Sequence, residues 1–301
     1  MDTKKGISLY RPQGRAKASM VMIHGMQEHH LRYKETAELL CEHGIAILTY
    51  DLPGHGAEAQ RSGELGWFGK EGGWDTMTES AVAMMRYMKK EYPDVPLWLF
   101  GHSMGSMIAR CCLQEREDLI DGMILTGTPY YDAGAPMAKV LIKTIAFFKG
   151  KRGHSAFLDK MITGKFNDHI KDPRTALDWL SVNEKNVNAY IQDPLCGVPF
   201  TIEGYYDLVC GMCRMHDITR FHCMKPELPI LIMIGDEDPC AGNVKQRRDT
   251  LNVLQKAGYN NVEMKVFTGM RHEILNESEA QLVRDEILRV TGCVNGVDKR
   301  Q

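Results

Sequence analysis

Short runs of apolar residues alternate along this chain with longer segments in which apolar residues recur every three or four positions. The continuous runs are typical of strands buried on both faces, and the three-to-four spacing is typical of amphipathic helices. Buried strands are predicted at 18–24, 45–50, 97–100, 122–126, 230–234 and 262–267. Helices are predicted at 33–43, 74–91, 104–114, 243–257 and 277–290.

The alternation of strands and helices predicts an α/β fold with a mostly parallel central sheet covered by helices on both faces. Between residues 129 and 224 the alternation stops, and only helical stretches are predicted, at 137–149, 155–162, 186–191 and 202–213. The sequence therefore predicts a core of residues 1–128 plus 225–301 and a helical insertion of residues 129–224. An insertion that leaves the carboxyl ends of parallel strands lies over the ligand crevice, so we expect it to act as a lid.

Composition narrows the class of protein. The 301 residues are 44% hydrophobic and 25% charged, and a net charge of -2 gives no reason to expect a nucleic-acid partner. No apolar run is long enough to cross a bilayer, and the first residues lack the apolar core of a secretory signal. Nine cysteines, an odd number, favour a reducing cytoplasm over a disulfide framework. Cys210 and Cys213 form a C-x-x-C pair without a second pair, so we predict no metal and no cofactor.

The candidate nucleophile is Ser103, because residues 101–105 read Gly-His-Ser-Met-Gly between a predicted strand and a predicted helix. This G-x-S-x-G pattern is typical of a nucleophile elbow, a sharp turn that exposes the serine hydroxyl. Gly101 and Gly105 let the helix pack close to the neighbouring strands. A serine hydroxyl reacts only when a base removes its proton and a third group orients that base.

Both partners follow predicted strands, in the order that this fold requires. His272 lies between the strand at 262–267 and the last helix, where a general base can reach Ser103. Three acids, Asp236, Glu237 and Asp238, follow the strand at 230–234. We choose Asp238 because the proline after it favours an extended backbone, and we keep Asp236 as the second choice.

An acyl-transfer site also needs two N–H donors for the oxyanion of the tetrahedral intermediate. The backbone N–H of Met104, directly after the nucleophile at a helix N-terminus, is one candidate. The second candidate is the backbone N–H of Met26, in the loop after the strand at 18–24.

Residues 24–33, which read His-Gly-Met-Gln-Glu-His-His-Leu-Arg-Tyr, resemble the HG-x-x-EH-x-x-RY stretch of the monoacylglycerol lipase and lysophospholipase group of α/β-hydrolases, a group of serine aminopeptidase S33 type. Motifs at 51–56, 101–105, 235–239 and 271–273 are similar to the same group. The resemblance implies an α/β-hydrolase fold and hydrolysis of a small-molecule or lipid ester through an acyl-enzyme on Ser103. Monoacylglycerols and lysophospholipid-like esters are the implied substrates. Because few residues precede Ala18, we expect the first one or two strands of the fold to be shortened or missing.

Two other functions stay open. An aminopeptidase of the same fold would need acids in the lid to bind a substrate amine, and the lid offers Glu184, Asp193, Glu203 and Asp207. A ligand-binding sensor on the same scaffold would need no general base, so the presence of the full set of catalytic residue types counts against it.

One helix of the lid carries an apolar stripe, made of Met137, Val140, Leu141, Ile145 and Phe148. Such a stripe usually packs against a core, which is the interpretation we favour. The alternatives are that it lines an acyl pocket or makes transient contact with a membrane surface. In the loop after the strand at 18–24, which carries Met26 and is called the oxyanion loop below, we expect Glu28 and Arg32 to form a local pair that supports the loop. The sequence leaves the oligomeric state open.

Overall fold

The fold is built on an eight-stranded sheet, in a computed structural model that describes residues 2–4 and 6–293. The strand order is β1-β2-β4-β3-β5-β6-β7-β8, in which the β1–β2 and β2–β4 pairs are antiparallel and the other pairs are parallel. The strands are β1 (Asp2–Lys4), β2 (Ile7–Tyr10), β3 (Ala18–Ile23), β4 (Ile45–Tyr50), β5 (Leu97–His102), β6 (Gly122–Thr126), β7 (Ile230–Gly235) and β8 (Val262–Phe267). The predicted α/β class is confirmed.

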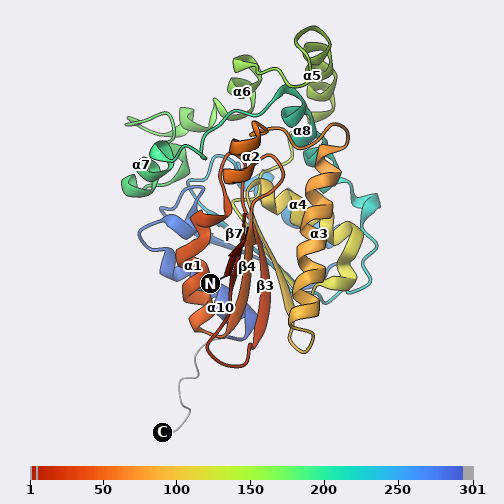
Figure 1. Ribbon diagram of the computed structural model, residues 1–301, viewed down its shortest axis with the longest axis vertical. Coiled ribbons are helices and arrows are strands. Elements are labelled where there is room, and N and C mark those ends of the chain that lie inside the picture. Colours follow the sequence, from red (N-terminus) through yellow and green to blue (C-terminus); the bar gives the residue numbers. More distant parts are fainter. Residues whose placement is uncertain (1, 5, 294–301) are drawn as a thin grey trace.

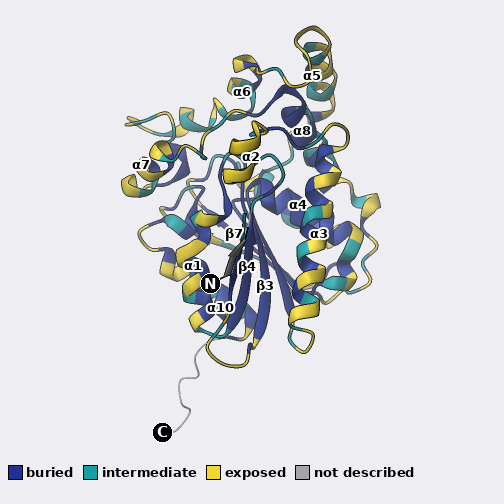
Figure 2. Ribbon diagram, in the orientation of Figure 1, coloured by how far each residue is buried: buried dark blue, intermediate teal, exposed yellow. Residues whose placement is uncertain are grey.

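Helices cover both faces of this sheet (Figure 1). Helices α1 (Lys34–Glu42) and α10 (Ala280–Thr291) lie on one face, and α3 (Gly73–Glu91) and α4 (Met104–Arg116) lie on the other. Every residue of β3 to β7 is buried, which explains their continuous apolar runs (Figure 2). Helix α9 (Val244–Lys256) contacts β8 at the edge of the sheet.

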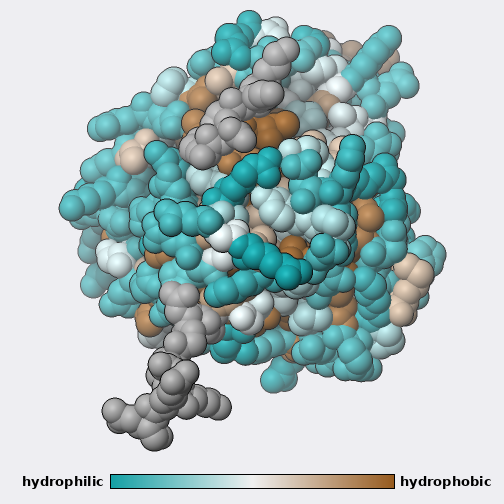
Figure 3. Space-filling model, turned by 60° about the horizontal axis from the view of Figure 1, so that its bottom comes forward, coloured by the Kyte–Doolittle hydropathy of each residue, from teal (hydrophilic) through white to brown (hydrophobic). Residues whose placement is uncertain are grey.

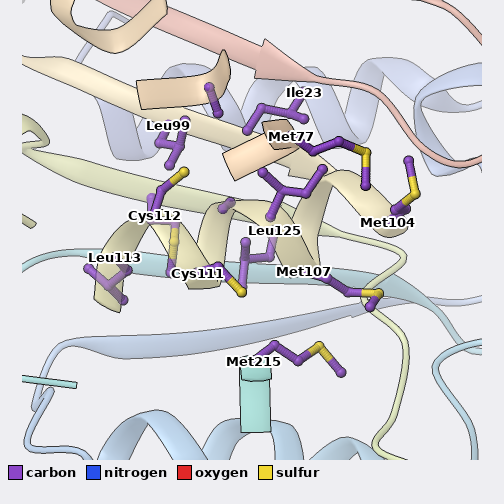
Figure 4. Close-up of a cluster of buried hydrophobic side chains, with 14 of the residues drawn as sticks. Ile23, Met77, Leu99, Met104, Met107, Cys111, Cys112, Leu113, Leu125 and Met215 are labelled. Atoms are coloured by element: carbon purple, nitrogen blue, oxygen red, sulfur yellow. The ribbon is translucent and has the colours of Figure 1, made fainter. Parts of the chain in front are cut away.

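The core on the α3 and α4 face is rich in sulfur. Met77, Met107 and Cys111 pack with aliphatic side chains between the helices and the sheet (Figure 4). Met215, from the insertion between β6 and β7, belongs to the same buried cluster. The insertion therefore shares a hydrophobic core with the sheet domain.

The two N-terminal strands are shortened but not missing, which agrees with one of the two alternatives expected from the sequence. β1 and β2 are only three and four residues long, and they extend the sheet beyond β4. A short helix that the sequence analysis does not predict, α2 (Gly56–Ser62), begins at Gly56, whose positive φ of 72° suits a glycine.

The insertion leaves the sheet after β6 and returns before β7, and it lies over the carboxyl ends of the parallel strands (Figure 1). It contains α5 (Ala135–Lys149), α6 (Ala156–Thr163), α7 (Glu184–Gln192) and α8 (Ile202–His216), joined by short 3-10 helices. Helix α8 packs against α3, α4 and α5. At its N-terminus, Thr201 hydrogen-bonds the carbonyl of Gly66, which attaches the insertion to the sheet domain.

The apolar stripe on α5 does not pack in the core, so the favoured interpretation of it is wrong. Met137, Val140 and Phe148 are 79%, 66% and 79% exposed, and only Ile145 packs against the core cluster. Phe147, beside the stripe, is 84% exposed. By contrast, the surface around the opposite end of the sheet is mostly hydrophilic (Figure 3). Among the described residues, no helix is both long and apolar enough to span a membrane.

Candidate active site

Ser103 occupies a sharp turn between β5 and α4. Its backbone has φ 51° and ψ -119°, a conformation that costs a residue with a side chain about 1–3 kcal/mol. The surrounding structure maintains this strain: the N–H of Ser103 donates to the carbonyl of Thr126 at 2.9 Å, and its own carbonyl accepts from the Ser106 hydroxyl at 2.6 Å. The turn places Ser103 at the carboxyl end of β5, facing a cavity.

The two glycines of the turn allow close approach of the backbone. A side chain at Gly101 would collide with the carbonyl of Gly105, and one at Gly105 would collide with the carbonyl of Ile23 in the neighbouring strand β3. This confirms the packing reason for glycine at both positions.

Asp238 and His272 come together from two separate loops, after β7 and β8. The Asp238 carboxylate oxygens lie 3.0 and 3.1 Å from Nδ1 of His272, and both residues are buried. Asp238 also accepts from the N–H of Cys240 at 2.8 Å. The competing acids Asp236 and Glu237 are exposed, and Asp236 accepts from the N–H of Gly269. Of the three acids, Asp238 is the one that contacts His272.

The charges of this pair stabilise each other. Burial works to lower the pKa of His272, but the charge of Asp238 and the hydrogen bond to it raise this pKa above its ordinary value. Burial works in the other direction on Asp238, and the adjacent His272 nevertheless keeps the pKa of that carboxyl below its usual range. The site thus contains a buried carboxylate that favours a proton on the imidazole beside it.

His102, inside the elbow, contacts Thr126 and packs beside His272. Its Nδ1 lies 3.0 Å from the Thr126 hydroxyl, and its ring centroid lies 4.8 Å from that of His272. Burial, and then the proximity of His272, lower the pKa of His102 to about 4. His102 is therefore neutral at pH 7, and His272 is the imidazole that can carry a proton.

The loop after β3 passes directly beside the nucleophile. A side chain at Gly25 would come within 3.2 Å of the Cβ atom of Ser103, and Met26 lines the same cavity as Ser103. The side chain of Met104 instead points into the sulfur-rich core, so only its backbone is available to the site (Figure 4). As the first residue of α4, Met104 has an N–H without a carbonyl partner inside the helix.

Glu28 fixes the conformation of this loop. Its carboxylate accepts from the N–H of Gly25 at 2.6 Å and from the Tyr33 hydroxyl at 2.7 Å, and it pairs with Arg32 at 2.8 Å. The predicted pair between Glu28 and Arg32 is present. Burial works to raise the pKa of Glu28, but the Arg32 guanidinium holds it below the usual range, so the buried carboxylate stays charged.

Arg32 also reaches a carboxylate that the sequence analysis did not single out. It donates to both oxygens of Glu273, the residue after His272, at 2.5 and 2.7 Å. Asn186 of α7 donates to Glu273 at 2.6 Å and accepts from Arg32 at 2.9 Å. One guanidinium therefore joins the oxyanion loop, the His272 loop and the insertion. The residue types alone give no signal of this pairing, because Arg32 and Glu273 are 241 positions apart.

A cavity of about 420 Å³ connects these groups with the insertion. From the sheet domain it is lined by Met26, Ser103 and His272, among others, and from the insertion by side chains of both polar and apolar types. Trp179 of the insertion lies with its ring 5.0 Å from that of His272. Trp179 was not predicted, because it lies outside the segments with helical spacing. The residues of the insertion at the cavity are Asp159, Lys160, Thr163, Gly164, Asn167, Ala176, Leu177, Trp179, Leu180, Tyr190 and Gly197.

The lid acids considered for an aminopeptidase do not line this cavity. Asp193 bonds His29, Glu203 pairs with Lys151, and Asp207 is buried against the first residue of α3. Glu184 is exposed at the start of α7. The acids at the cavity are instead Glu28, Glu273 and Asp159, and the first two pair with Arg32.

A second serine, histidine and aspartate arrangement lies elsewhere in the sheet domain. Ser8 Oγ is 3.0 Å from Nε2 of His30, whose Nδ1 is 2.6 Å from Asp51. Ser8 lies within strand β2 with no exposed surface, and it does not line the cavity that contains Ser103. This arrangement binds β2 to the loops after β3 and β4, and a substrate cannot reach it.

The order of the strands, the serine turn and the two loops that follow later strands define an α/β-hydrolase. A family model described as Serine aminopeptidase, S33, matches residues 14–279. The chain belongs to this family, and the predicted resemblance is confirmed.

Similar proteins agree with this assignment. The chain is 32% identical over 271 residues to the "Monoglyceride lipase homolog" of Monkeypox virus, with 90% of this chain and 87% of that protein covered. It is 27% identical over 235 residues to the "Monoglyceride lipase" of Mus musculus, with 76% and 68% covered. The solved structure of a thermostable carboxyl esterase from Bacillus coagulans in complex with glycerol superposes with a TM-score of 0.88 at 28% identity, covering 96% and 94%. The general prediction of a carboxylic ester hydrolase is therefore confirmed.

Proposed function

We propose that this protein hydrolyses monoacylglycerols or lysophospholipid-like esters through an acyl-enzyme on Ser103. The observation that carries the proposal is the shared cavity, which is lined by the strained Ser103 and by His272, the partner of Asp238. Support for the substrate class comes from the relatives named as monoglyceride lipases and from the esterase in complex with glycerol.

The proposed reaction begins with proton transfer from Ser103 Oγ to Nε2 of His272 as the oxygen attacks the ester carbonyl. Asp238 holds Nδ1 of His272 and stabilises the imidazolium that forms. The N–H groups of Met26 and Met104 donate to the oxyanion. His272 then gives its proton to the departing alcohol, and an attacking water, activated by the same imidazole, releases the acid from Ser103.

We also propose that residues 129–224 act as the lid over this site. The insertion supplies more than half of the residues that line the cavity, so its side chains define the space available to the acyl chain and the alcohol. In this proposal the sheet domain performs the chemistry and the insertion selects the substrate.

Labelling with a fluorophosphonate probe tests the nucleophile. The wild-type protein should be labelled and Ser103→Ala should not, while Ser8→Ala, in the second arrangement, should label as the wild type does. Continued labelling of Ser103→Ala would overturn the assignment. A panel of glycerol and p-nitrophenyl esters graded by acyl length, with an amino-acyl amide for comparison, then tests the substrate class: faster turnover of the amide would favour the aminopeptidase alternative.

The exposed face of α5 supports a further part of the proposal, transient contact with an anionic lipid surface. Much of α5 is exposed (Figure 2), and Met137, Val140, Phe147 and Phe148 are each 66–84% exposed. Residues 133–158 contain five Lys and Arg residues and no Asp or Glu. Aromatic side chains within a purely basic segment suit an interface between anionic headgroups and acyl chains. Such contact would bring the lid to the place where its lipid substrates are found.

The proposed compartment is a reducing one, such as the cytoplasm. All nine cysteines are free thiols, and six of them are buried. Free thiols persist where the redox potential is low.

A further inference from the structure

A second group of potential ligand atoms lies where the oxyanion loop meets the insertion. His29 follows Glu28 in the loop after β3, and Asp193 and Cys196 lie in the turn after α7. Nε2 of His29 is 2.8 Å from a carboxylate oxygen of Asp193. One donor atom from each residue, including the Cys196 thiol, lies within 4.8 Å of the other two.

Backbone contacts hold these three donors in place. The N–H of Cys196 donates to the carbonyl of Asp193 at 3.0 Å, which closes the turn that brings carboxylate and thiol together. The N–H of Leu195 donates to the other Asp193 oxygen at 2.9 Å. Gly197 donates to the carbonyl of Gln27 at 2.8 Å, so the turn is fixed against the loop that carries His29.

The donors are buried on one side and open on the other. His29 and Cys196 are buried, whereas the side chain of Asp193 is 30% exposed. An ion can therefore arrive from solvent past Asp193 and be enclosed by the imidazole and the thiol.

We propose that His29, Asp193 and Cys196 form a binding site for a zinc ion, with water as the fourth ligand. Imidazole nitrogen, thiolate sulfur and carboxylate oxygen are the ligands that zinc takes, and three protein ligands around a tetrahedral ion leave one position open. Binding moves the proton of His29 to Nδ1 and releases the Cys196 thiol proton to solvent. The Asp193 carboxylate and the Cys196 thiolate then balance the two charges of the ion.

A zinc ion at this position links the loop after β3 to the insertion, at a place where the two segments are already in contact. His29 is three residues from Met26, and Asp193 and Cys196 belong to the insertion. Because the ion binds only when these segments are together, it stabilises the folded arrangement by mass action. This proposal stands independently of the proposed ester hydrolysis, since none of its residues moves a proton in that reaction.

A competing set of donors exists at Asp238, Cys240 and His272, whose ligand atoms are also within 4.8 Å of one another. All three of these residues are buried, whereas the Asp193 side chain of the first set is 30% exposed. An ion there would have no half-exposed ligand through which to enter. The set around His29 is the better site for this reason.

Titration of the chelator-treated, full-length protein with Zn²⁺ and with Co²⁺ tests the proposal. We expect one ion per chain, a thermal transition that rises with Zn²⁺ concentration, and the charge-transfer absorption of a cobalt–thiolate bond. Cys196→Ser and His29→Gln should each weaken the affinity for Zn²⁺ by about 100-fold or more, and Cys196→Ser should abolish the charge-transfer band. Thermal melts without metal check that both variants fold.

Cys240→Ser is the matched control, because it removes a buried thiol from the competing set. It should bind Zn²⁺ and Co²⁺ as the wild type does. Absence of stoichiometric Zn²⁺ binding by the wild-type protein would overturn the proposal. So would affinity that survives in both Cys196→Ser and His29→Gln, or that is lost in Cys240→Ser alone.

Discussion

Arg32 donates two hydrogen bonds to Glu273, and Glu273 directly follows His272 in the chain. The same guanidinium pairs with Glu28, which holds the N–H of Gly25. The two carboxylates repel each other in a buried space, and the positive charge between them removes that repulsion. Arg32 thus joins the loop after β3, which carries Gly25 and Glu28, to the loop after β8, which carries His272.

Replacement of Arg32 by lysine should disturb both loops. Lysine keeps the charge but cannot bond two carboxylates through a planar fork. We expect Arg32→Lys to displace the catalytic groups on these loops by about 1 Å. Such a displacement should lower kcat by about 10- to 100-fold, with a smaller change in KM. Arg61→Lys is the control, since Arg61 pairs with Glu58 on an exposed surface, and steady-state kinetics should show no effect of it. Equal kcat values for the two variants would contradict the positioning role.

The pH dependence of hydrolysis should report His272. The base must be neutral to accept the serine proton, so activity should fall as the pH decreases through the pKa of His272, which Asp238 raises. Asp238→Asn removes the charge that raises this pKa. We expect the acid limb of kcat/KM to move to lower pH while kcat drops by about 10³- to 10⁴-fold. A pH profile with an unmoved acid limb would show that another group controls it.

The strain at Ser103 should be measurable as lost stability. Glycine adopts a positive φ without a steric penalty, whereas alanine retains the strain. Both substitutions remove the hydroxyl, so Ser103→Ala is the matched control for Ser103→Gly. We expect the glycine variant to be more stable than the alanine variant by about 1 kcal/mol, despite the greater freedom of glycine in the unfolded chain. Chemical denaturation of the two variants measures the difference in their free energies of unfolding. A glycine variant less stable than the alanine variant would contradict the claim that the backbone of Ser103 is strained.

Asp207 should make stability depend on pH near neutrality. This α8 carboxyl lies against Gly73 at the start of α3, with one oxygen lacking a hydrogen-bond partner. Burial, and then the nearby Glu203, raise its pKa to about 7. Because the folded state holds this proton more tightly than the unfolded state does, the stabilisation is fully present below about pH 4 and is lost as the pH rises through about 7.

Asp207→Asn, which carries no charge at any pH, should therefore melt higher than the wild type at pH 8, by about 2–4 °C, and the difference should shrink toward pH 5. Thermal melts at several pH values measure it. Asp75→Asn, on the exposed first turn of α3, serves as a comparison that should not reproduce this pH dependence. A constant difference between Asp207→Asn and the wild type across this range would contradict the prediction.

The α5 surface predicts binding to anionic vesicles. Replacing Phe147 and Phe148 together by serine removes two exposed rings, and we expect more than 10-fold weaker cosedimentation with vesicles of phosphatidylcholine and phosphatidylserine. Turnover of a water-soluble short-chain ester should be unchanged, since neither residue lines the cavity. Leu282→Ser, an exposed apolar residue on α10, is the control. Equal binding by the double variant and the control would contradict a role for α5.

The sequence by itself determined the order and type of most elements and the loops that carry Ser103, Asp238 and His272. Burial on both faces of a parallel strand requires a continuous apolar run, and turns require particular residues, so both leave local patterns. The proline after Asp238 was enough to prefer it over Asp236. Apolar runs and turn residues involve neighbours along the chain, so they can be recognised in the sequence alone.

Only the tertiary structure decided the rest. The contact of Arg32 with Glu273 joins residues far apart in the chain, and no local pattern encodes such a distance. An apolar stripe has the same spacing whether it faces a core or solvent, so the exposure of α5 followed only from where the insertion packs. The arrangement of Ser8, His30 and Asp51 has the residue types and hydrogen bonds of a catalytic triad, but it is buried. A catalytic site also needs access to a cavity, and the whole fold determines that access.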